Sequence, residues 1–348
     1  MANPVKIAII GAGFGSKVAL PAYVELDELE PVAMWSRRPE RAEEIAQGGD
    51  VETATSDLDE VLSVPGLEAV HVATPVVMHA PVAIAAARRG LHVLCEKPLA
   101  HDLPAAREVV AAIDAAGVVG AVNYGRRFQE ARQALLDRAR EVVGRPRMAS
   151  VSLVYSDHAE PDSRSFSWVH DAALGGGRLQ GYGVHDLDLL LELFPDVEAV
   201  ASALDVGVSA RPGDGDEMEQ VTAEDAYAIL LRFRGGGVGV VSLVATAHHD
   251  RADTIEIYGD EGSVRLDAER RVWWGRAGDE LQCDGPLEAS SGEAFKHVAR
   301  SFAAAIREGS APEPSLEEAL RVQALYDAVR AADAQRDWVA PAAVPSQA

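Results

Sequence analysis

One stretch near the start of the chain limits the fold more than any other. It is VKIAIIGAGFGS, residues 5–16, in which five of the first six residues are apolar and Gly11 and Gly13 follow at once. A short apolar run that ends in a glycine-rich turn is typical of a buried parallel strand that leads into a helix. The pattern is G-x-G-x-x-G with Ser16 in the last place.

Each small residue in this pattern has a physical reason. Gly11 allows a tight turn, and Gly13 lets a diphosphate approach the backbone. Ser16 is small enough for close packing of helix against strand. A helix that begins near Gly15–Lys17, directly after Phe14, would hold the diphosphate through its free N–H groups and its dipole. The alternative is an ordinary glycine turn, but its place after a strand and before a helix favours dinucleotide binding.

The first 123 residues alternate between strand-like and helix-like segments. We expect strands at Val5–Ile10, Pro31–Trp35, Glu68–Thr74, His92–Cys95 and Val118–Val122. We expect helices at Ser16–Glu25, Pro39–Ala46, Asp57–Leu62, Pro81–Gly90 and Leu103–Ala116. This alternation predicts a doubly wound parallel sheet, in which ligands bind beyond the carboxyl ends of the strands.

Three strand ends should therefore meet at one edge of the sheet. They are Gly11–Ser16, Ala73-Thr74-Pro75 with His79 nearby, and Glu96-Lys97-Pro98. Lys97 follows a buried strand where a nicotinamide would reach, and desolvation would lower its pKa so that it could exchange protons or bind a substrate oxygen. The alternative is a surface lysine in a turn set by the proline. His71 lies mid-strand and is expected to be a core histidine.

The end of the second predicted strand bears on the choice of cofactor. NAD sites place an acid about 20 residues after the glycines to bind the ribose 2′-hydroxyl. Here the strand ends in Ser36, Arg37 and Arg38, a hydroxyl and two guanidiniums that suit a 2′-phosphate. The sequence therefore favours NADP over NAD, with a solvated loop as the alternative reading.

In the second half of the chain, the alternation ends and strands follow one another. They are Met148–Tyr155, Val197–Val206, Ala226–Phe233, Val238–Thr246, Thr254–Tyr258, Ser263–Leu266 and Val272–Trp274. Strands joined by tight turns predict an antiparallel sheet. One helix, near Gly183–Leu193, interrupts the series, and it puts His185 and Asp188 on one face near its start. His185 could act there as an acid or base, or simply be a satisfied histidine at a helix end.

Composition excludes several classes of protein. The 348 residues suffice for two domains with cores of their own. A net charge of −23 disfavours nucleic-acid binding. Two distant cysteines make no disulfide framework and fit a reducing cytoplasm, and no apolar run is long enough to span a membrane.

Five stretches in order along the chain resemble the glucose–fructose oxidoreductase, inositol dehydrogenase and rhizopine-catabolism (Gfo/Idh/MocA) family. They are IIGAGFGSKVALPA, WSRRPERAEEIA, HVATPVVMHAPVAIAAARRGLHVLCEKPLA, GGGRLQGYGVHDLDLL and PSLEEALRVQALYDAV. The EKP tripeptide after a Rossmann pattern and the later G-x-H-x-x-D are the most specific marks.

The resemblance implies a fold and a division of the chain. It implies a Rossmann domain over residues 1–123 and, over residues 124–348, a C-terminal α/β domain on a large, mostly antiparallel sheet. The last helix, about 315–332, would pack back on the first domain. The free face of the sheet would form a homodimer or homotetramer.

The resemblance also implies roles for single residues. Lys97 matches the catalytic lysine of the family, Glu96 the residue near the nicotinamide ribose, and His185 the active-site histidine. Many members read D-x-G-x-H-x-x-D, but the first acid falls on Gly181 here. Asp171, His170 and Tyr182 are candidates to replace that acid, and the change leaves open a loss of catalysis.

Three further features have two readings each. In the polar segment 157–170, Trp168 could bind a sugar face or pack, and Tyr182 and Asp188 could contact substrate. The pair Arg126–Arg127 could bind an acidic substrate or brace the domains. Adjacent histidines of a strand point to opposite faces, so His248 and His249 are expected to form no metal centre, although either could reach a pocket.

The sequence thus predicts an NADP-dependent oxidoreductase, with NAD as the alternative cofactor, that interconverts a secondary alcohol and a ketone on a sugar, cyclitol or related polyol. Lys97 and His185 would be the catalytic pair. The alternatives are an enzyme for a non-sugar carbonyl or diol, an enzyme that oxidises a glycoside transiently, and a non-catalytic sensor of cofactor or sugar.

Overall fold

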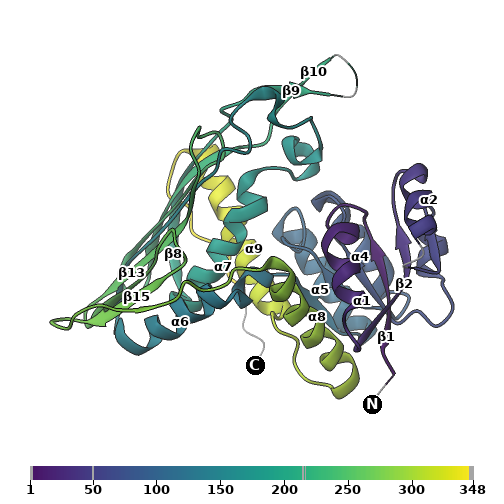
Figure 1. Cartoon of the computed structure of the whole chain (residues 1–348), viewed down its shortest axis with the longest axis horizontal. Coiled ribbons are helices and arrows are strands. Elements are labelled where there is room, and N and C mark those ends of the chain that lie inside the picture. The colour runs from purple at the N-terminus through teal and green to yellow at the C-terminus, as the bar shows by residue number, and fades with distance from the viewer. Residues whose placement is uncertain (1–2, 49–50, 214, 216, 345–348) are drawn as a thin grey trace. The chain divides into compact units, whose positions relative to one another are not determined.

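The chain divides into two compact units in a computed structural model that describes residues 3–48, 51–213, 215 and 217–344. The first unit comprises residues 1–126 and 290–323, and the second comprises residues 127–289 and 324–345, apart from the residues just excluded. The expected ranges 1–123 and 124–348 include termini, 1–2 and 345–348, that lie outside the described residues. Figure 1 shows each unit built on its own sheet.

The first unit is a six-stranded parallel sheet in the order β3-β2-β1-β4-β5-β6. Its strands are β1 Val5–Ile10, β2 Leu29–Trp35, β3 Thr53–Thr55, β4 Ala69–Val72, β5 His92–Cys95 and β6 Gly120–Val122. This order is that of the Rossmann fold, so the predicted doubly wound sheet is confirmed. The strand β3 was not expected, because its three residues carry little apolar signal.

Helices connect these strands. They are α1 Leu20–Val24, α2 Pro39–Gly48, α3 Leu58–Leu62, α4 His79–Ala87 and α5 Leu103–Ala116, joined in the same unit by α8 Ser291–Glu308. A π-helical turn, Gly15–Ala19, precedes α1, and a 3₁₀ turn, Val76–Met78, precedes α4. Residues Val5, Ile7, Ile9 and Ile10 are fully buried, which explains why the first strand reads as an almost continuous apolar run.

The second unit is an eight-stranded sheet in the order β16-β15-β14-β13-β7-β12-β11-β8. Its strands are β7 Pro146–Val154, β8 Val197–Asp205, β11 Ala226–Phe233, β12 Val238–Val244, β13 Arg251–Gly259, β14 Gly262–Leu266, β15 Val272–Arg276 and β16 Gln282–Asp284. Only the β12–β7 pair is parallel, so the predicted mostly antiparallel sheet is confirmed. A small hairpin, β9 Ala210–Pro212 and β10 Met218–Gln220, stands apart.

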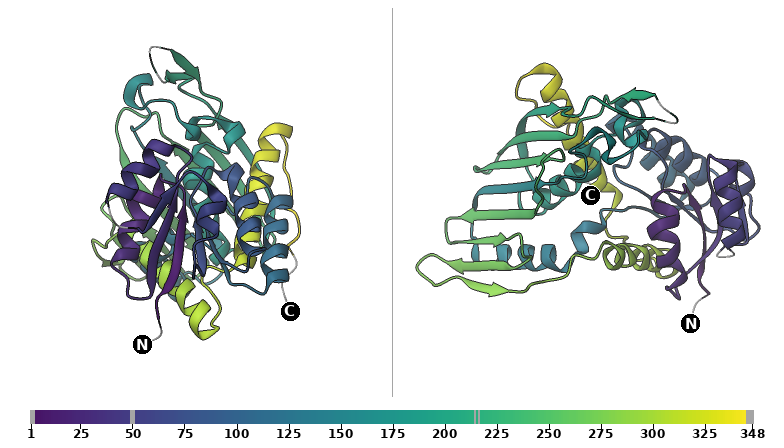
Figure 2. Two further views of the ribbon diagram at one scale, coloured as in Figure 1. Left: turned by 90° about the vertical axis from the view of Figure 1, so that its right-hand side faces the viewer. Right: turned by 45° about the horizontal axis from the view of Figure 1, so that its top comes forward.

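Helices cover one face of this sheet, as Figure 2 shows, and the other face carries exposed apolar side chains. The covering helices are α6 Glu130–Val142 and α7 Val184–Leu193. The last helix, α9 Leu316–Gln335, has its first eight residues in the first unit and the rest in the second. On the open face, Val238, Met148 and Tyr258 are cross-strand neighbours, and Leu230 lies two residues from Arg232, the partner of Val238.

The helix α6 and the strands β9, β10 and β16 were not expected. Leu135, Leu136, Ala139 and Val142 form a buried stripe along α6, so its helical period was present in the sequence. The two cysteines differ in environment, since Cys95 is buried in β5 and Cys283 is exposed in the edge strand β16. Within the described residues, none of the helices combines the length and apolar character that crossing a bilayer requires.

Candidate active site

The carboxyl ends of β1 and β4 meet at Gly11. The φ of Gly11 is +127°, and a Cβ there would lie 2.2 Å from the carbonyl oxygen of Ala73. Only glycine can adopt this backbone so close to the neighbouring strand end. The turn is therefore closed against β4 at the point where the strand order reverses, which is where dinucleotides bind in this fold.

The rest of the turn forms an open backbone surface. A Cβ on Gly13 would meet no atom within 4 Å, whereas one on Gly15 would lie 2.6 Å from Ile9. The π turn begins at Gly15, where Leu20 N–H bonds its carbonyl. The ring of Phe14 lies edge-on to His71 and to Phe295 of α8, with centroids 6.2 and 5.5 Å away. The open approach at Gly13 and the packing at Gly15 fit a bound diphosphate.

At the end of β2, Ser36 is buried and the two arginines that follow are exposed. The Ser36 N–H donates to Thr55 O at 3.1 Å, and its hydroxyl accepts from the Arg38 N–H at 3.3 Å. Arg37 and Arg38 thus extend from a turn that their own backbone and Ser36 hold in place. No acid occupies the position next to the strand end.

Beyond β4, the Thr74 hydroxyl is buried and has no hydrogen-bond partner among the described residues. Pro75 begins the next turn. The buried ring of His79 lies between two carbonyl oxygens, with Nδ1 2.8 Å from Pro98 O and Nε2 2.9 Å from Thr74 O. Burial lowers the pKa of His79, whereas its contacts with the two carbonyl oxygens raise it; the neutral ring donates to one of these oxygens and the protonated ring to both.

Glu96 and Lys97 follow β5 at the same edge, and the Lys97–Pro98 peptide bond is cis. The buried carboxylate of Glu96 accepts a hydrogen bond from Asn123 Nδ2 at 2.6 Å. The pKa of Lys97 is lowered to about 8, chiefly by burial. The charge of Glu96 opposes this shift, and the charge of Arg126 adds to it. A lysine with such a pKa holds and releases a proton near neutral pH.

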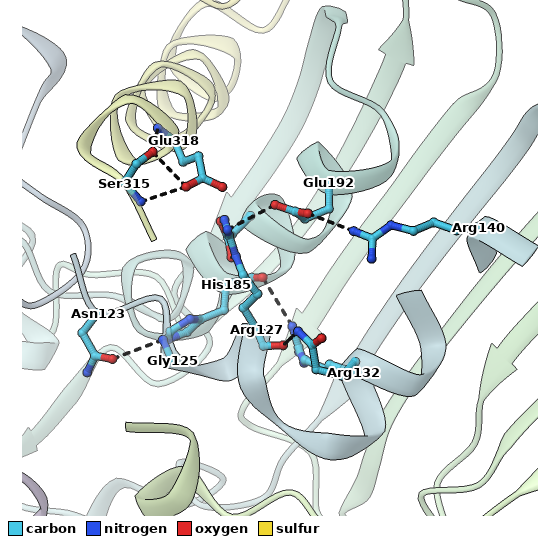
Figure 3. Close-up of polar contacts among 11 residues, drawn as sticks. Asn123, Gly125, Arg127, Arg132, Arg140, His185, Glu192, Ser315 and Glu318 are labelled. Carbon is cyan, nitrogen blue, oxygen red and sulfur yellow. Dashed lines mark hydrogen bonds and ion pairs between the residues drawn. The ribbon is translucent and has the colours of Figure 1, made fainter. Parts of the chain in front are cut away.

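Asn123 was missed by the sequence analysis. It comes directly after β6, as Glu96 comes after β5. The other three strand ends were selected because ligands bind beyond the carboxyl ends of parallel strands, and the same reasoning applied to β6 would have found Asn123. Its side chain also accepts from the Gly125 N–H at 3.2 Å, as Figure 3 shows.

In the second unit, His185 lies in the first turn of α7 and is buried. The backbone before it forms a second π turn, Leu179–Gly183, closed by the Val184 N–H on Leu179 O. Such turns occur often at functional sites. The Nη1 of Arg132 on α6 donates to the His185 carbonyl at 3.3 Å, a contact drawn in Figure 3.

Glu224 and Gly177 set the start of this π turn. The Leu179 N–H donates to Glu224 Oε1 at 2.8 Å. Gly177 has a φ of +117°, and a Cβ there would lie 2.1 Å from the same oxygen. Burial raises the pKa of Glu224 to about 7. Gly177 before His185 is therefore required by a carboxylate 47 residues further on, which no sequence signal indicated.

Asp188 shares the buried face of α7 with His185 and is paired with Arg127. The Arg127 Nη2 lies 2.5 Å from Asp188 Oδ1, and its Nη1 lies 3.2 Å from Glu192. Figure 3 shows Glu192 continuing to Arg140. Arg127 therefore ties the segment before α6 to α7, and its charge is matched by two carboxylates of that helix.

Three residues are candidates to replace the acid that is missing at position 181, and their surroundings differ. Asp171 accepts from the Ala173 N–H at 2.9 Å and caps a short turn. His170 is buried beside His158, and burial followed by the charge of Arg211 lowers its pKa to about 4. Tyr182 stacks obliquely on Tyr155, with centroids 5.1 Å apart. Tyr182 directly follows Gly181 in the sequence, and unlike Asp171 its side chain does not cap a turn.

The polar segment over residues 157–170 is held by a buried arginine. Arg211 of β9 donates to the carbonyl oxygens of His158 at 2.8 Å and of Glu160 at 3.0 Å. Trp168 is half-buried and begins a 3₁₀ turn. A Cβ on Gly176 would lie 2.6 Å from the Trp168 carbonyl, so this turn packs closely on the glycine run.

The expectation for His248 and His249 was wrong in its premise. The strand β12 ends at Val244, and both histidines lie in the exposed loop that follows. His248 approaches Glu160, with Nδ1 3.7 Å from Oε1. The argument from opposite faces of a strand therefore does not apply to them.

A cavity of about 430 Å³ lies in the first unit beside Pro4, Tyr23 and Leu29. Pro4 and Leu29 lie at the amino ends of β1 and β2, and Tyr23 lies in α1. Because ligands of such sheets bind at the carboxyl ends, this cavity is not the cofactor site.

Gly181 leaves room for a side chain, because a Cβ there would meet no atom within 4 Å. Its φ is not positive. We expect Gly181→Ala to stabilise the protein by about 0.4–1 kcal/mol, because alanine restricts the unfolded chain and fits the folded one. Urea unfolding of both proteins measures the difference, with Gly177→Ala, which must clash with Glu224, as the destabilised control. A loss of stability in Gly181→Ala would show that the position is not open.

Comparison with known proteins agrees with this architecture. Residues 5–124 match a model described as an oxidoreductase family with an NAD-binding Rossmann fold. Residues 139–340 match the C-terminal alpha/beta domain of the same family.

Individual relatives span nearly the whole chain. A levoglucosan dehydrogenase of Pseudarthrobacter phenanthrenivorans is 28% identical over 96% of this chain and 97% of its own length. An inositol 2-dehydrogenase of Rhizobium meliloti is 25% identical over 93% and 95%. A solved levoglucosan dehydrogenase in complex with NADH and L-sorbose has a TM-score of 0.87, at 27% identity over 99% of this chain and all of that one. The chain belongs to the Gfo/Idh/MocA oxidoreductase family.

Proposed function

We propose that this chain is a dehydrogenase that interconverts a secondary alcohol and a ketone on a sugar, cyclitol or related polyol. The observation that carries the proposal is Lys97, a lysine with a pKa of about 8 placed next to Glu96 at the carboxyl edge of a Rossmann sheet. The names of the relatives, which act on levoglucosan and inositol, support the polyol class.

A nicotinamide dinucleotide would supply the hydride acceptor or donor. Gly11, Gly13, Phe14 and Gly15 would hold its diphosphate. The Thr74 hydroxyl, which has no hydrogen-bond partner among the described residues, offers a donor beside Pro75 and His79. Glu96 would bind near the nicotinamide ribose. These are the residues of the edge described above, and the open backbone at Gly13 supports this assignment.

The chain itself must manage the hydroxyl proton. Lys97 in its neutral form accepts that proton when an alcohol is oxidised, and in its ammonium form returns it when a ketone is reduced. We propose His185 as its partner at the substrate oxygen. Trp168, Tyr182 and Asp188 would contact or orient the substrate, Asp188 through its pairing with Arg127.

The test is a panel of sugars, cyclitols, polyols and non-sugar diols, monitored at the nicotinamide absorbance with both cofactors. Turnover on a polyol supports the proposal. Turnover only on a non-sugar carbonyl or diol would show that the proposed polyol class of substrate is wrong.

A sensor of cofactor or sugar is the second candidate, and Gly181 favours it, because the acid common in the family is missing there. Cofactor binding without turnover on any member of the panel, together with a co-purifying protein, would establish the sensor. Turnover would exclude it.

We propose NADP as the preferred cofactor, because Arg37 and Arg38 stand where an acid would bind the 2′-hydroxyl of NAD. The double variant Arg37→Ala, Arg38→Ala should weaken NADP binding by about tenfold or more, since each guanidinium contributes a charge-assisted hydrogen bond to a phosphate. Binding of NAD should hardly change. Dissociation constants of both nucleotides, measured for both proteins by titration calorimetry, decide this. Tighter binding of NAD than of NADP by the unmodified protein would overturn the assignment.

We also propose that the exposed apolar face of the second sheet joins copies of the chain into a homodimer or homotetramer. The cross-strand row of Val238, Met148 and Tyr258 supports this. Light scattering of the protein and of a Val238→Lys, Met148→Lys variant tests it, and an unmodified monomer would contradict it.

A further inference from the structure

A buried histidine in the middle of the parallel sheet is used by nothing described so far. His71 is a residue of β4 with no exposed surface. Its ring stacks on Phe295 of α8 at 5.4 Å with an interplanar angle of 18°. Tyr23 and Phe14 meet it edge-on at 5.9 and 6.2 Å. Aromatic neighbours from three separate segments therefore fix the plane of the ring.

The two ring nitrogens each face a polar group. The Nδ1 lies 3.1 Å from the Tyr23 hydroxyl, and the Nε2 lies 3.4 Å from Glu96 Oε1. An ionised carboxylate only accepts hydrogen bonds, so Nε2 must carry the proton that it shares with Glu96. Nδ1 accepts from the Tyr23 hydroxyl when the ring is neutral and donates to the Tyr23 oxygen when the ring is protonated. In both forms Nε2 donates to Glu96.

The hydrogen bonds that join Tyr23, His71 and Glu96 end at the carboxylate beside Lys97. Burial alone would raise the pKa of Glu96, but its hydrogen bond with His71, the charges of His71 and Lys97, and the bond from Asn123 together lower it. The charge of Glu96 in turn raises the pKa of Lys97 against burial. The other titratable or charged groups coupled to Glu96 or Lys97 are Tyr23, His79, Cys95 and Arg126.

We propose that His71 is a positioning residue, which by donating to Glu96 keeps that carboxylate ionised and thereby sets the pH at which Lys97 releases its proton. His71 touches neither the substrate nor the reacting atoms. It acts through Glu96, and Tyr23 acts through it. The inference rests on the proposed function for its consequence in catalysis, but the proton equilibrium of Lys97 is a property of the protein alone.

The sign of the effect follows from the charges. Without the donor, the buried Glu96 takes up a proton more readily. A neutral Glu96 no longer stabilises the ammonium form of Lys97, so the pKa of Lys97 falls. A purely structural histidine, which only fills space between Tyr23 and Phe295, would leave that pKa unchanged when replaced by a side chain of similar volume.

The small number of lysines allows the titration of Lys97 to be observed directly. The chain has only four lysines, Lys6, Lys17, Lys97 and Lys296. The hydrogen bonds that Lys296 donates to Glu25 and Glu293 raise its pKa, so its signal titrates well away from that of Lys97. With lysine labelled at Cε and Nζ, a nuclear magnetic resonance titration of the full chain needs neither substrate nor cofactor, and Lys97→Arg identifies the signal.

Three variants separate the roles. His71→Leu removes the donor and keeps an apolar side chain of moderate size. His71→Gln places an amide N–H near the position of Nε2, and His71→Asn places one near Nδ1 instead. We expect the pKa of Lys97 to fall by about half a unit to one unit in His71→Leu and His71→Asn. In His71→Gln it should stay close to that of the unmodified protein.

An unchanged pKa in both His71→Leu and His71→Asn would overturn the proposal. An equal fall in His71→Gln would also overturn it, because the effect would then come from packing. If His71→Leu does not fold, His71→Asn against His71→Gln gives the same comparison with polar side chains. If the proposed role of Lys97 in catalysis is wrong, turnover in Lys97→Ala will be unchanged. That outcome does not affect the result of the titration.

Discussion

Replacing Lys97 by alanine lowers the turnover number by about 10²-fold or more if the amine manages the hydroxyl proton, since general acid–base catalysis contributes that much. Alanine removes the amine without adding bulk next to the cis peptide bond to Pro98. The measurement is kcat at saturating polyol and cofactor. The dissociation constant of the nucleotide should change little, which separates chemistry from binding.

The pH profile of the unmodified protein carries the same information. Because the pKa of Lys97 is about 8, the neutral amine gains population as the pH rises through that value. Oxidation, which needs the neutral form, should therefore rise through about pH 8, and reduction, which needs the ammonium form, should fall over the same range.

A matched control for this variant is Lys296→Ala, which removes a partly buried lysine of α8 that is paired with Glu293. It should leave both kcat and the pH profile unchanged. Full turnover in Lys97→Ala, or a profile with no inflection near pH 8, would remove Lys97 from the mechanism.

The largest expected effect on stability is at Arg132. Its Nη2 lies 2.6 Å from Asp186 Oδ1, and both side chains are buried between α6 and α7. Arg132→Met keeps the apolar stem but leaves the carboxylate of Asp186 buried without this cation. Breaking a buried ion pair from one side costs about 3–5 kcal/mol. Urea unfolding, followed by circular dichroism, measures the change in the free energy of unfolding.

Arg140 offers the contrast. It pairs with Glu192 at 3.2 Å, but its side chain is about half exposed. Arg140→Met should cost about 0–1 kcal/mol, because solvent screens an exposed pair. Equal losses in the two variants would mean that burial does not set the strength of these pairs.

The parallel sheet was predictable because its strands other than β3 are largely apolar and each turn has its own chemistry. The run Val5–Ile10 was placed at its observed bounds, and Gly11 was assigned to a tight turn that its φ of +127° confirms. The start of α9 also follows local chemistry, since Ser315 and Glu318 form a capping box in which the Ser315 N–H donates to Glu318 at 2.8 Å, as Figure 3 shows.

What could not be predicted depends on residues far apart in the sequence. Glu224 reaches the π turn before His185 across more than 40 residues, and no local pattern marks it. His71 was expected to be a core residue, and it is fully buried. Its hydrogen bond to Glu96, 25 residues later, follows from the register of β4 beside β5 and not from either local sequence.

The histidine of α7 owes its direction to chain length as well as to residue type. An α-helix advances by about 100° per residue, and the π turn Leu179–Gly183 accommodates one residue more than an α-helical turn would. Gaining or losing one residue in the glycine-rich run would therefore rotate His185 about the helix axis while every side chain kept its identity. Spacing in this stretch is thus as strict a requirement as composition, and a motif search that tolerates gaps there would collect chains whose imidazole points elsewhere.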